Sequence, residues 1–250
     1  NKDFNDDTIP VVSVGKEEGN VLLTLNLLPF ETCCKTIARY AFSDEYLTNH
    51  SDPLFINITL RTNNNINTIN KVSELIKKYF GGRLLGSEYS YSRKNIAQMR
   101  LKDLIGKVVI FSDKRARRTK LAELVNYTWG RAFMKERSYE QIHETSDHKY
   151  LINWNKRNIT RVYPLRDIKE SSNYNPNISW RFGCQFVSLN YQNFDDNMKD
   201  NIVKFTRRSF VLKPKSIRYK KVCFRNPKKQ DPNVSLANME VSGPGYTVTS

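Results

Sequence analysis

The alternation of hydrophobic and polar residues predicts strands and helices that follow one another along the chain. Apolar, β-branched and aromatic residues dominate 53–60 and 107–111, which favours two strands. Between them, apolar residues recur at helical spacing over 66–80 and two glycines follow, which predicts an amphipathic helix with a defined end. A strand, a helix and a second strand in this order indicate a right-handed βαβ unit and a parallel sheet.

The same alternation extends to both sides of this unit. Residues 11–14 predict a short buried strand, and helical spacing of apolar residues over 30–42 predicts another helix. Residues 151–154 and 160–163 predict short extended pieces, and 185–190 predicts a further strand. The whole pattern therefore indicates an α/β fold with a mainly parallel sheet.

The composition is that of a globular protein with a strongly basic surface. Hydrophobic residues make up 39% of the 250-residue chain, and no run approaches the roughly 18 apolar residues of a membrane-spanning helix. The chain has 41 Lys and Arg against 25 Asp and Glu, a net charge of +16. This charge favours an anionic partner, either phospholipid headgroups, nucleic acid or an acidic protein surface. We predict a basic surface at Arg115, Arg117, Arg118 and Lys120.

The cysteines and histidines do not point to a particular chemistry. The four cysteines lack zinc-site spacing, which favours reduced thiols and an intracellular location. His143 and His148 are five residues apart and do not share one helical face. No nucleic-acid recognition motif and no glycine-rich phosphate loop is present, so nucleic acid is the least favoured anionic partner. The residues by themselves indicate a basic α/β domain.

A long stretch in the second half resembles a known enzyme family. Residues 171–176 (SSNYNP), Trp180 and residues 183–192 (GCQFVSLNYQ) resemble the signature block of the eukaryotic phosphoinositide-specific phospholipases C. This block belongs to the Y half of their catalytic domain. Residues 161–164 (RVYP) and 210–214 (FVLKP) match further segments of the Y half in the same order.

The resemblance implies a phospholipase-C-like TIM-type barrel of which this chain supplies only the later strands. It divides the chain into a late X-half-like segment at 1–113, a short basic linker at 114–120, a Y-half-like segment at 121–219 and an extended C-terminal arm at 220–250. Open sheet edges promote aggregation, so we expect an upstream segment or a protein partner to complete the barrel.

The resemblance also implies cleavage of inositol phospholipids with two histidines and Ca²⁺, but two matching positions differ. Val14 stands at a catalytic histidine of the family and cannot transfer a proton. Thr59 stands at a calcium-binding glutamate and offers one neutral oxygen. We therefore expect a pseudoenzyme without catalytic residues, metal site or cofactor, and its class as an enzyme stays open.

The lipid-headgroup side of the family's site matches better. Ser138, Arg161 and Tyr163 stand at headgroup-contacting positions of the family. An arginine can bind phosphate through two hydrogen bonds, and a tyrosine can cover an inositol ring. The alternative role of Arg161 is a structural ion pair, and that of Tyr163 is core packing.

Three functions remain open. The first is a degenerate phospholipase-C-like module that binds anionic lipid, phosphoinositide or phosphate, or acts as a scaffold, in the cytoplasm or at a membrane surface. The second is a structural component of a large assembly such as a virus particle, to which a basic charge and an extended tail are suited. The third is an active phosphatidylinositol phospholipase C whose N-terminal half is missing from this chain.

Overall fold

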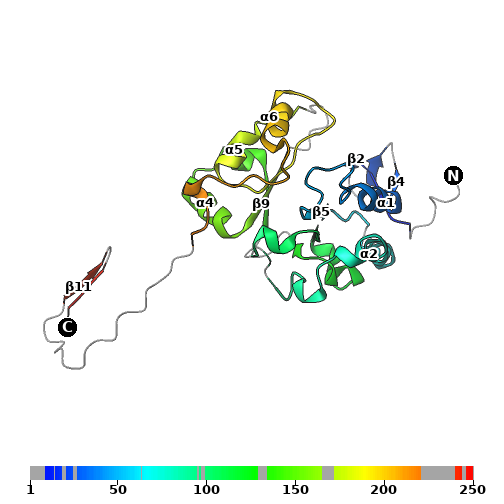
Figure 1. Cartoon of the computed structure of the whole chain (residues 1–250), viewed down its shortest axis with the longest axis horizontal. Coiled ribbons are helices and arrows are strands. Elements are labelled where there is room, and N and C mark those ends of the chain that lie inside the picture. Colours follow the sequence, from blue (N-terminus) through cyan, green and yellow to red (C-terminus); the bar gives the residue numbers. More distant parts are fainter. Residues whose placement is uncertain are drawn as a thin grey trace. The chain divides into compact units, whose positions relative to one another are not determined.

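A computed structural model describes the greater part of the chain (Figure 1). The described residues are 9–13, 15–18, 21–24, 27–62, 64–94, 96, 99–128, 134–164, 172–220, 240–243 and 246–249. The chain forms two units, residues 1–219 and 220–250, and each is considered by itself.

The first unit alternates strands and helices along the chain. Its described helices are α1 (Phe30–Tyr40), α2 (Ile66–Phe80), α3 (Tyr139–His143), α4 (His148–Arg157), α5 (Pro176–Arg181) and α6 (Asp196–Phe205). Its described strands are β1 (Val11–Val12), β2 (Gly15–Glu18), β3 (Val21–Thr24), β4 (Leu28–Pro29), β5 (Leu54–Ile58), β6 (Val108–Ser112), β7 (Tyr127–Thr128), β8 (Met134–Ser138), β9 (Ile159–Tyr163) and β10 (Phe186–Val187). In the second unit, β11 (Glu240–Gly243) and β12 (Tyr246–Thr249) form an antiparallel hairpin.

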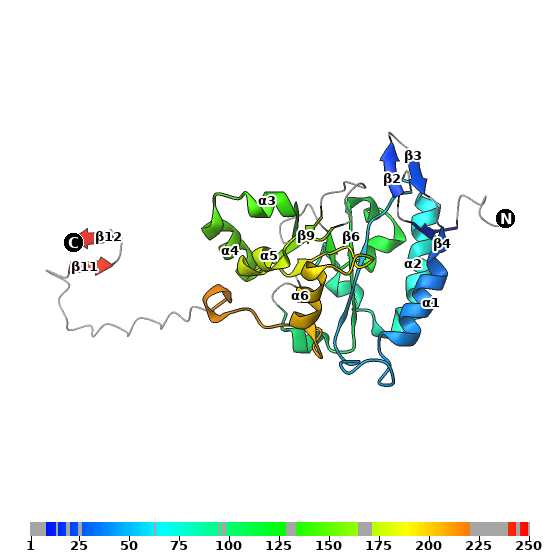
Figure 2. The ribbon, with the colours of Figure 1, turned by 90° about the horizontal axis from the view of Figure 1, so that it is seen from above.

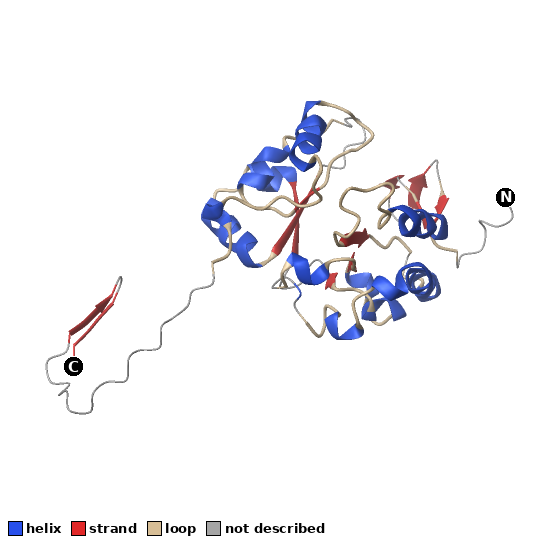
Figure 3. Cartoon of the chain, viewed as in Figure 1, coloured by secondary structure: helices blue, strands red, loops and turns tan. Residues whose placement is uncertain are grey.

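Two parallel sheets form the centre of the first unit. One has the strand order β5-β6-β7, and the other has the order β10-β9-β8. Leu54 of β5 pairs with Val108 of β6, and Met134 of β8 pairs with Ile159 of β9, all in parallel register. Figure 3 shows these strands between helices that lie on the outside. The predicted α/β fold with parallel strands is therefore confirmed.

Strand β6 separates two layers of the hydrophobic core. All five of its residues are buried, as expected for a parallel strand that is covered on both faces. Val108 and Ile110 pack in the cluster that contains helix α2, whereas Val109 and Phe111 pack in a second cluster. The Phe111 ring contacts Phe186 of the other sheet edge-on, with ring centroids 5.2 Å apart. This second cluster therefore joins the two sheets across their inner faces.

Helix α2 begins and ends where its sequence pattern predicts. The Asn65 side chain caps it and accepts hydrogen bonds from the backbone amides of Asn67 and Thr68, at 3.1 and 3.2 Å. One face of the helix, including Ile69 and Ile76, is buried with Cys34 of α1 in the same cluster. Figure 2 shows α1 and α2 side by side along the edge of the unit.

Three predicted elements differ from the structure. The prediction of an extended piece at 151–154 is wrong, because these residues lie inside helix α4. Asp147 caps this helix through the Tyr150 amide, at 2.8 Å. The strand predicted at 11–14 covers only Val11 and Val12 among the described residues, and both side chains are exposed rather than buried. The strand predicted at 185–190 is limited to β10, because only two of its residues form ladder pairs.

Candidate functional site

Strands β8 and β9 bring the three predicted headgroup residues into one region. Ser138 ends β8, Tyr163 ends β9, and the two residues pair in parallel register. Arg161 precedes Tyr163 by two residues and lies on the same face of β9, because side chains alternate along a strand. The three side chains therefore stand at or near the carboxyl ends of the strands, where barrel enzymes place their sites.

Arg161 binds two polar residues from opposite sheets. Its Nη1 donates a hydrogen bond to Oε1 of Glu136, which is its register partner on β8. When the Asn57 amide is turned so that its oxygen faces the guanidinium, Nη1 and Nε of Arg161 both lie 3.2 Å from this oxygen. The side chains of Arg161 and Glu136 are each 23% exposed, so solvent reaches the pair. Arg161 thus bridges β5 and β8 while its charge stays accessible.

Ser138 has a structural role that the sequence comparison did not indicate. Its Oγ accepts a hydrogen bond from the Gln141 backbone amide at 3.3 Å, and Oε1 of Gln141 accepts one from the Ser138 amide at 3.0 Å. These two bonds form a capping box at the start of α3. The Ser138 side chain is buried, and its hydroxyl is engaged in capping α3.

Thr59 lies just after β5, beside a clasp that ties β5 to β6. The Asp113 carboxylate accepts hydrogen bonds from the backbone amides of Leu60 and Arg115, at 2.9 and 2.8 Å. Arg115 Nη1 in turn donates to the Leu60 carbonyl at 2.6 Å. Thr59 itself is exposed at this rim. The clasp fixes the carboxyl ends of two parallel strands next to the predicted site.

The predicted basic surface divides into bound and exposed side chains. Arg115 belongs to the clasp with Asp113. Lys120 lies 3.5 Å from Glu74 on α2 and is exposed. Arg117 and Arg118 are exposed, and Arg118 has a left-handed φ of 61°. The outward charge of residues 114–120 therefore rests on Arg117 and Arg118 more than on Arg115.

Neither the predicted loss of the catalytic histidine nor the predicted loss of calcium ligands is decided by the structure. Val14 lies outside the described residues. Within the described ranges, no group of three or more His, Cys, Asp or Glu side chains is placed to hold a metal ion. Two carboxylates near the site, Asp113 and Glu136, each bind an arginine. The expected absence of a cofactor stays a prediction.

Sequence reasoning missed Glu136 and Asn57. Both stand in strands with their side chains toward Arg161. The signal was present for Glu136, because it precedes Ser138 by two residues and so shares its face of β8. No sequence signal links Asn57 to Arg161, because the contact joins strands of different sheets.

Asn173, in the signature block, holds the polar loop that follows β10. The Asn173 side chain is buried, and its Nδ2 donates to the carbonyls of Asn190 and Asn193, at 3.2 and 3.0 Å. Its Oδ1 accepts a hydrogen bond from the Asn190 amide at 2.5 Å. Asp195 accepts from the Asn173 amide at 2.7 Å and caps α6. Asn173 thus fixes the chain before α5, and the Asn175 side chain caps that helix.

Comparison with known proteins supports the resemblance. Residues 107–216 match the family model described as phosphatidylinositol-specific phospholipase C, Y domain. The matched range begins with β6 and includes the basic segment 114–120. Over 70 residues, the chain is 46% identical to 1-phosphatidylinositol 4,5-bisphosphate phosphodiesterase beta-4 of Bos taurus, covering 27% of this chain and 7% of that protein. Over 162 residues, it is 31% identical to the zeta-1 enzyme of Homo sapiens, covering 54% of this chain and 26% of that protein.

Solved structures agree on the fold. The PLC21 structure of S. officinalis superimposes with a TM-score of 0.69 at 21% identity, covering 88% of this chain and 32% of that one. The PLC21 structure of L. pealei superimposes with a TM-score of 0.63 at 19% identity, covering 86% and 32%. The chain thus spans about a third or less of these relatives. The Y-domain match, the similar enzymes and the shared fold together support a eukaryotic-type phosphoinositide-specific phospholipase C X/Y region in this chain.

Proposed function

We propose that this chain is a catalytically degenerate phosphoinositide phospholipase-C-like module that binds anionic lipid headgroups at the carboxyl ends of β8 and β9. The observation that carries the proposal is the placement of Arg161. Its guanidinium is accessible, lies on the face that also carries Tyr163, and is positioned by Asn57 and Glu136. A guanidinium held in this way can share its donors with a phosphate oxygen.

Three features support binding of a surface lipid. The net charge of +16 attracts anionic membranes. Arg117 and Arg118 extend outward from the loop that follows β6, at the same end of the strands as Arg161. No helix in the described part of the chain is long and apolar enough to cross a bilayer. Peripheral contact with a membrane surface, inside the cell, is therefore the mode of binding that we propose.

Loss of catalysis is supported by the residues at two family positions. Valine at position 14 has no proton to transfer, and threonine at position 59 has no carboxylate. General acid–base catalysis typically contributes about 10²–10⁴-fold to a rate, so a single such loss greatly reduces turnover. We expect restoration to require at least Val14→His together with Thr59→Glu.

The headgroup proposal is tested by co-sedimentation with vesicles of phosphatidylcholine, with and without phosphatidylinositol 4,5-bisphosphate. We expect binding only with the phosphoinositide, and a loss of affinity of about tenfold in Arg161→Gln, since a charge-assisted hydrogen bond contributes about 1.5–3 kcal/mol. Arg181→Gln is the matched control, because Arg181 is exposed at the last turn of α5, away from the site. An equal loss of vesicle affinity in both variants would mean that only the net charge of the protein matters, and would refute a headgroup site at Arg161.

Two alternatives are separated by further assays. An active phospholipase would hydrolyse phosphatidylinositol bisphosphate in the presence of Ca²⁺ and stop with a chelator, which would refute degeneracy. A structural component of a large assembly such as a virion would co-purify with particles, and removal of the second unit, residues 220–250, would release it. Vesicle binding that depends on Arg161 favours the lipid module over that assembly.

A further inference from the structure

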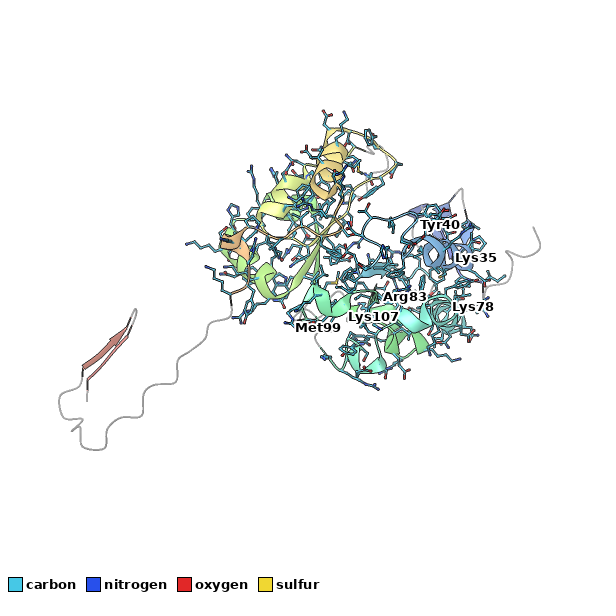
Figure 4. The ribbon with its side chains drawn as sticks, viewed as in Figure 1. Lys35, Tyr40, Lys78, Arg83, Met99 and Lys107 are labelled. Atoms are coloured by element: carbon cyan, nitrogen blue, oxygen red, sulfur yellow. The ribbon has the colours of Figure 1, made fainter. Side chains whose placement is uncertain are left out.

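A cavity of about 320 Å³ is lined by Ile159, the first residue of β9, two positions before Arg161. Tyr163, at the other end of β9, does not line it. Four residue steps along a strand separate Ile159 from Tyr163 by about 13 Å. Met99, which is labelled in Figure 4, also lines the cavity. Phe186, which also lines the cavity, is the register partner of Arg161, so the cavity adjoins the candidate headgroup site, although the three predicted headgroup residues do not line it.

Most of the cavity wall is apolar. The apolar side chains come from three strands, from the segment before β6 and from the segment after α6: Phe55, Ile96, Met99, Leu101, Leu104, Ile159, Phe186 and Phe210. A cavity of about 150 Å³ with such a lining holds a benzene molecule. The volume here is about twice as large, so it suits a short alkyl chain or a larger ring system.

The amide groups at one edge of the cavity are already bound within the protein. The Asn155 carbonyl accepts hydrogen bonds from Gln185 Nε2 at 2.9 Å and from Lys213 Nζ at 2.7 Å. Asn155 Nδ2 donates to the Phe182 carbonyl, and its Oδ1 accepts from the Thr160 hydroxyl. These bonds fix the wall of the cavity and leave the amides little capacity for a ligand.

Two polar groups of the wall have capacity left. Lys213 Nζ has three protons and donates one to Asn155, and no described carboxylate forms an ion pair with it. The Tyr127 side chain is 4% exposed, and its hydroxyl has no hydrogen-bond partner among the described residues. Burial lowers the pKa of Lys213 to about 8, as expected for an ammonium group without a counter-ion. Buried polar groups in proteins normally have partners, so the Tyr127 hydroxyl indicates a missing acceptor, and Lys213 in the same cavity wall can donate two further hydrogen bonds.

We propose that this cavity binds an amphiphile with one anionic head group and a short apolar chain, with the head group at Lys213 and the chain along Phe186 and Phe210. The head group supplies the counter-ion that Lys213 lacks, and an oxygen of the ligand accepts the hydrogen bond of Tyr127. Lys156 and Arg157 line the same cavity and add positive charge beside the head group. A ligand with a cationic head group would meet three cations and is excluded.

The test is isothermal titration of the full chain with decanoate, with decyl phosphate and with decyltrimethylammonium at equal ionic strength. We expect saturable binding of the two anions at one site and none of the cation, and the tighter anion identifies the head group. Lys213→Met keeps the aliphatic stem and should weaken anion binding at least tenfold, and Tyr127→Phe should weaken it about threefold. Lys114→Met is the control, because Lys114 is exposed beyond the other end of β6. Equal binding of the cation, or an unchanged affinity in Lys213→Met, would overturn the proposal.

A second measurement does not depend on the stability of the variants. In the wild-type chain labelled with ¹³C at the methionine methyl groups, decanoate should shift the signal of Met99, which lines the cavity. The signal of Met198, which is buried in α6 and does not line the cavity, should stay in place. A shift of Met198 without a shift of Met99 would show that the ligand binds elsewhere and would refute the site.

Discussion

The carboxylate of Asp113 accepts a hydrogen bond from the backbone amide of Leu60, at 2.9 Å, and so joins the carboxyl ends of β5 and β6. The same carboxylate accepts the Arg115 amide, whose side chain returns to the Leu60 carbonyl. Asp113 stands after β6 and is buried. In this chain a buried carboxylate and an arginine therefore close the strand ends near the predicted headgroup site.

Asp113→Ala is expected to destabilise the fold by about 2–3 kcal/mol, because it leaves the buried Leu60 amide and the partly buried Arg115 amide without acceptors and Arg115 without its carboxylate. The measurement is the urea unfolding midpoint, followed by circular dichroism. Asp44→Ala is the control, since Asp44 is exposed in the turn after α1 and should change stability by less than about 0.5 kcal/mol. Similar midpoints for the two variants would contradict the role of the clasp.

Asn173→Ala is expected to cost more stability than Asn175→Ala. The first variant removes both the donors and the acceptor that hold Asn190 and Asn193, and so loses three hydrogen bonds of about 0.5–1.5 kcal/mol each. The second variant removes only a helix cap of α5, which typically contributes about 1 kcal/mol. Thermal unfolding of both variants gives the order, and a larger loss in Asn175→Ala would be inconsistent with the polar loop that we describe.

Glu136→Gln is expected to increase binding to phosphoinositide vesicles by about threefold to tenfold. Glu136 forms an ion pair with Arg161. Without the negative charge of Glu136, the positive charge of the guanidinium attracts a phosphate group more strongly. This prediction rests on the proposed function, and vesicle co-sedimentation checks it. Glu123→Gln makes the same change of net charge at an exposed position beside the basic segment. A weaker affinity in Glu136→Gln would refute competition between this carboxylate and the lipid phosphate.

Lys213 is expected to make stability depend on pH above neutrality. Burial lowers its pKa from 10.5 to about 8 in the folded chain, so between these values the unfolded chain binds more protons. The free energy of unfolding therefore rises with pH from about 8 towards 10.5, relative to a chain without this group. The groups that face Lys213 are Asn155 and Cys184, and burial raises the pKa of the Cys184 thiol to about 12, above this range.

This dependence is measured by urea unfolding of the wild type and of Lys213→Met at pH values from 7 to 10. The stability difference between the two proteins should shift in favour of the wild type as the pH rises. A constant difference would mean that Lys213 keeps an ordinary pKa in the folded chain.

The sequence determined those helices and strands that show a clear repeat of apolar residues within one segment. The apolar spacing of 66–80 gave helix α2 with its observed bounds, because one face of the helix is buried along its whole length. The apolar, β-branched residues of β5 and β6, with a helix between them, predicted two parallel strands, and the two strands pair in this way. The family resemblance located Ser138, Arg161 and Tyr163, and their strands then placed them at one end of the sheet.

Contacts between distant segments were decided only by the tertiary structure. Residues 151–154 have strand-like residues, yet α4 forms there because Asp147 caps it and Leu151 and Asn155 share its buried face. The pairing of Arg161 with Asn57, the clasp of Asp113 on Leu60 and the cavity beside Lys213 each join residues more than 50 positions apart, or strands of different sheets. A sequence pattern reports the period of a single element, whereas such contacts depend on the register and packing of several elements.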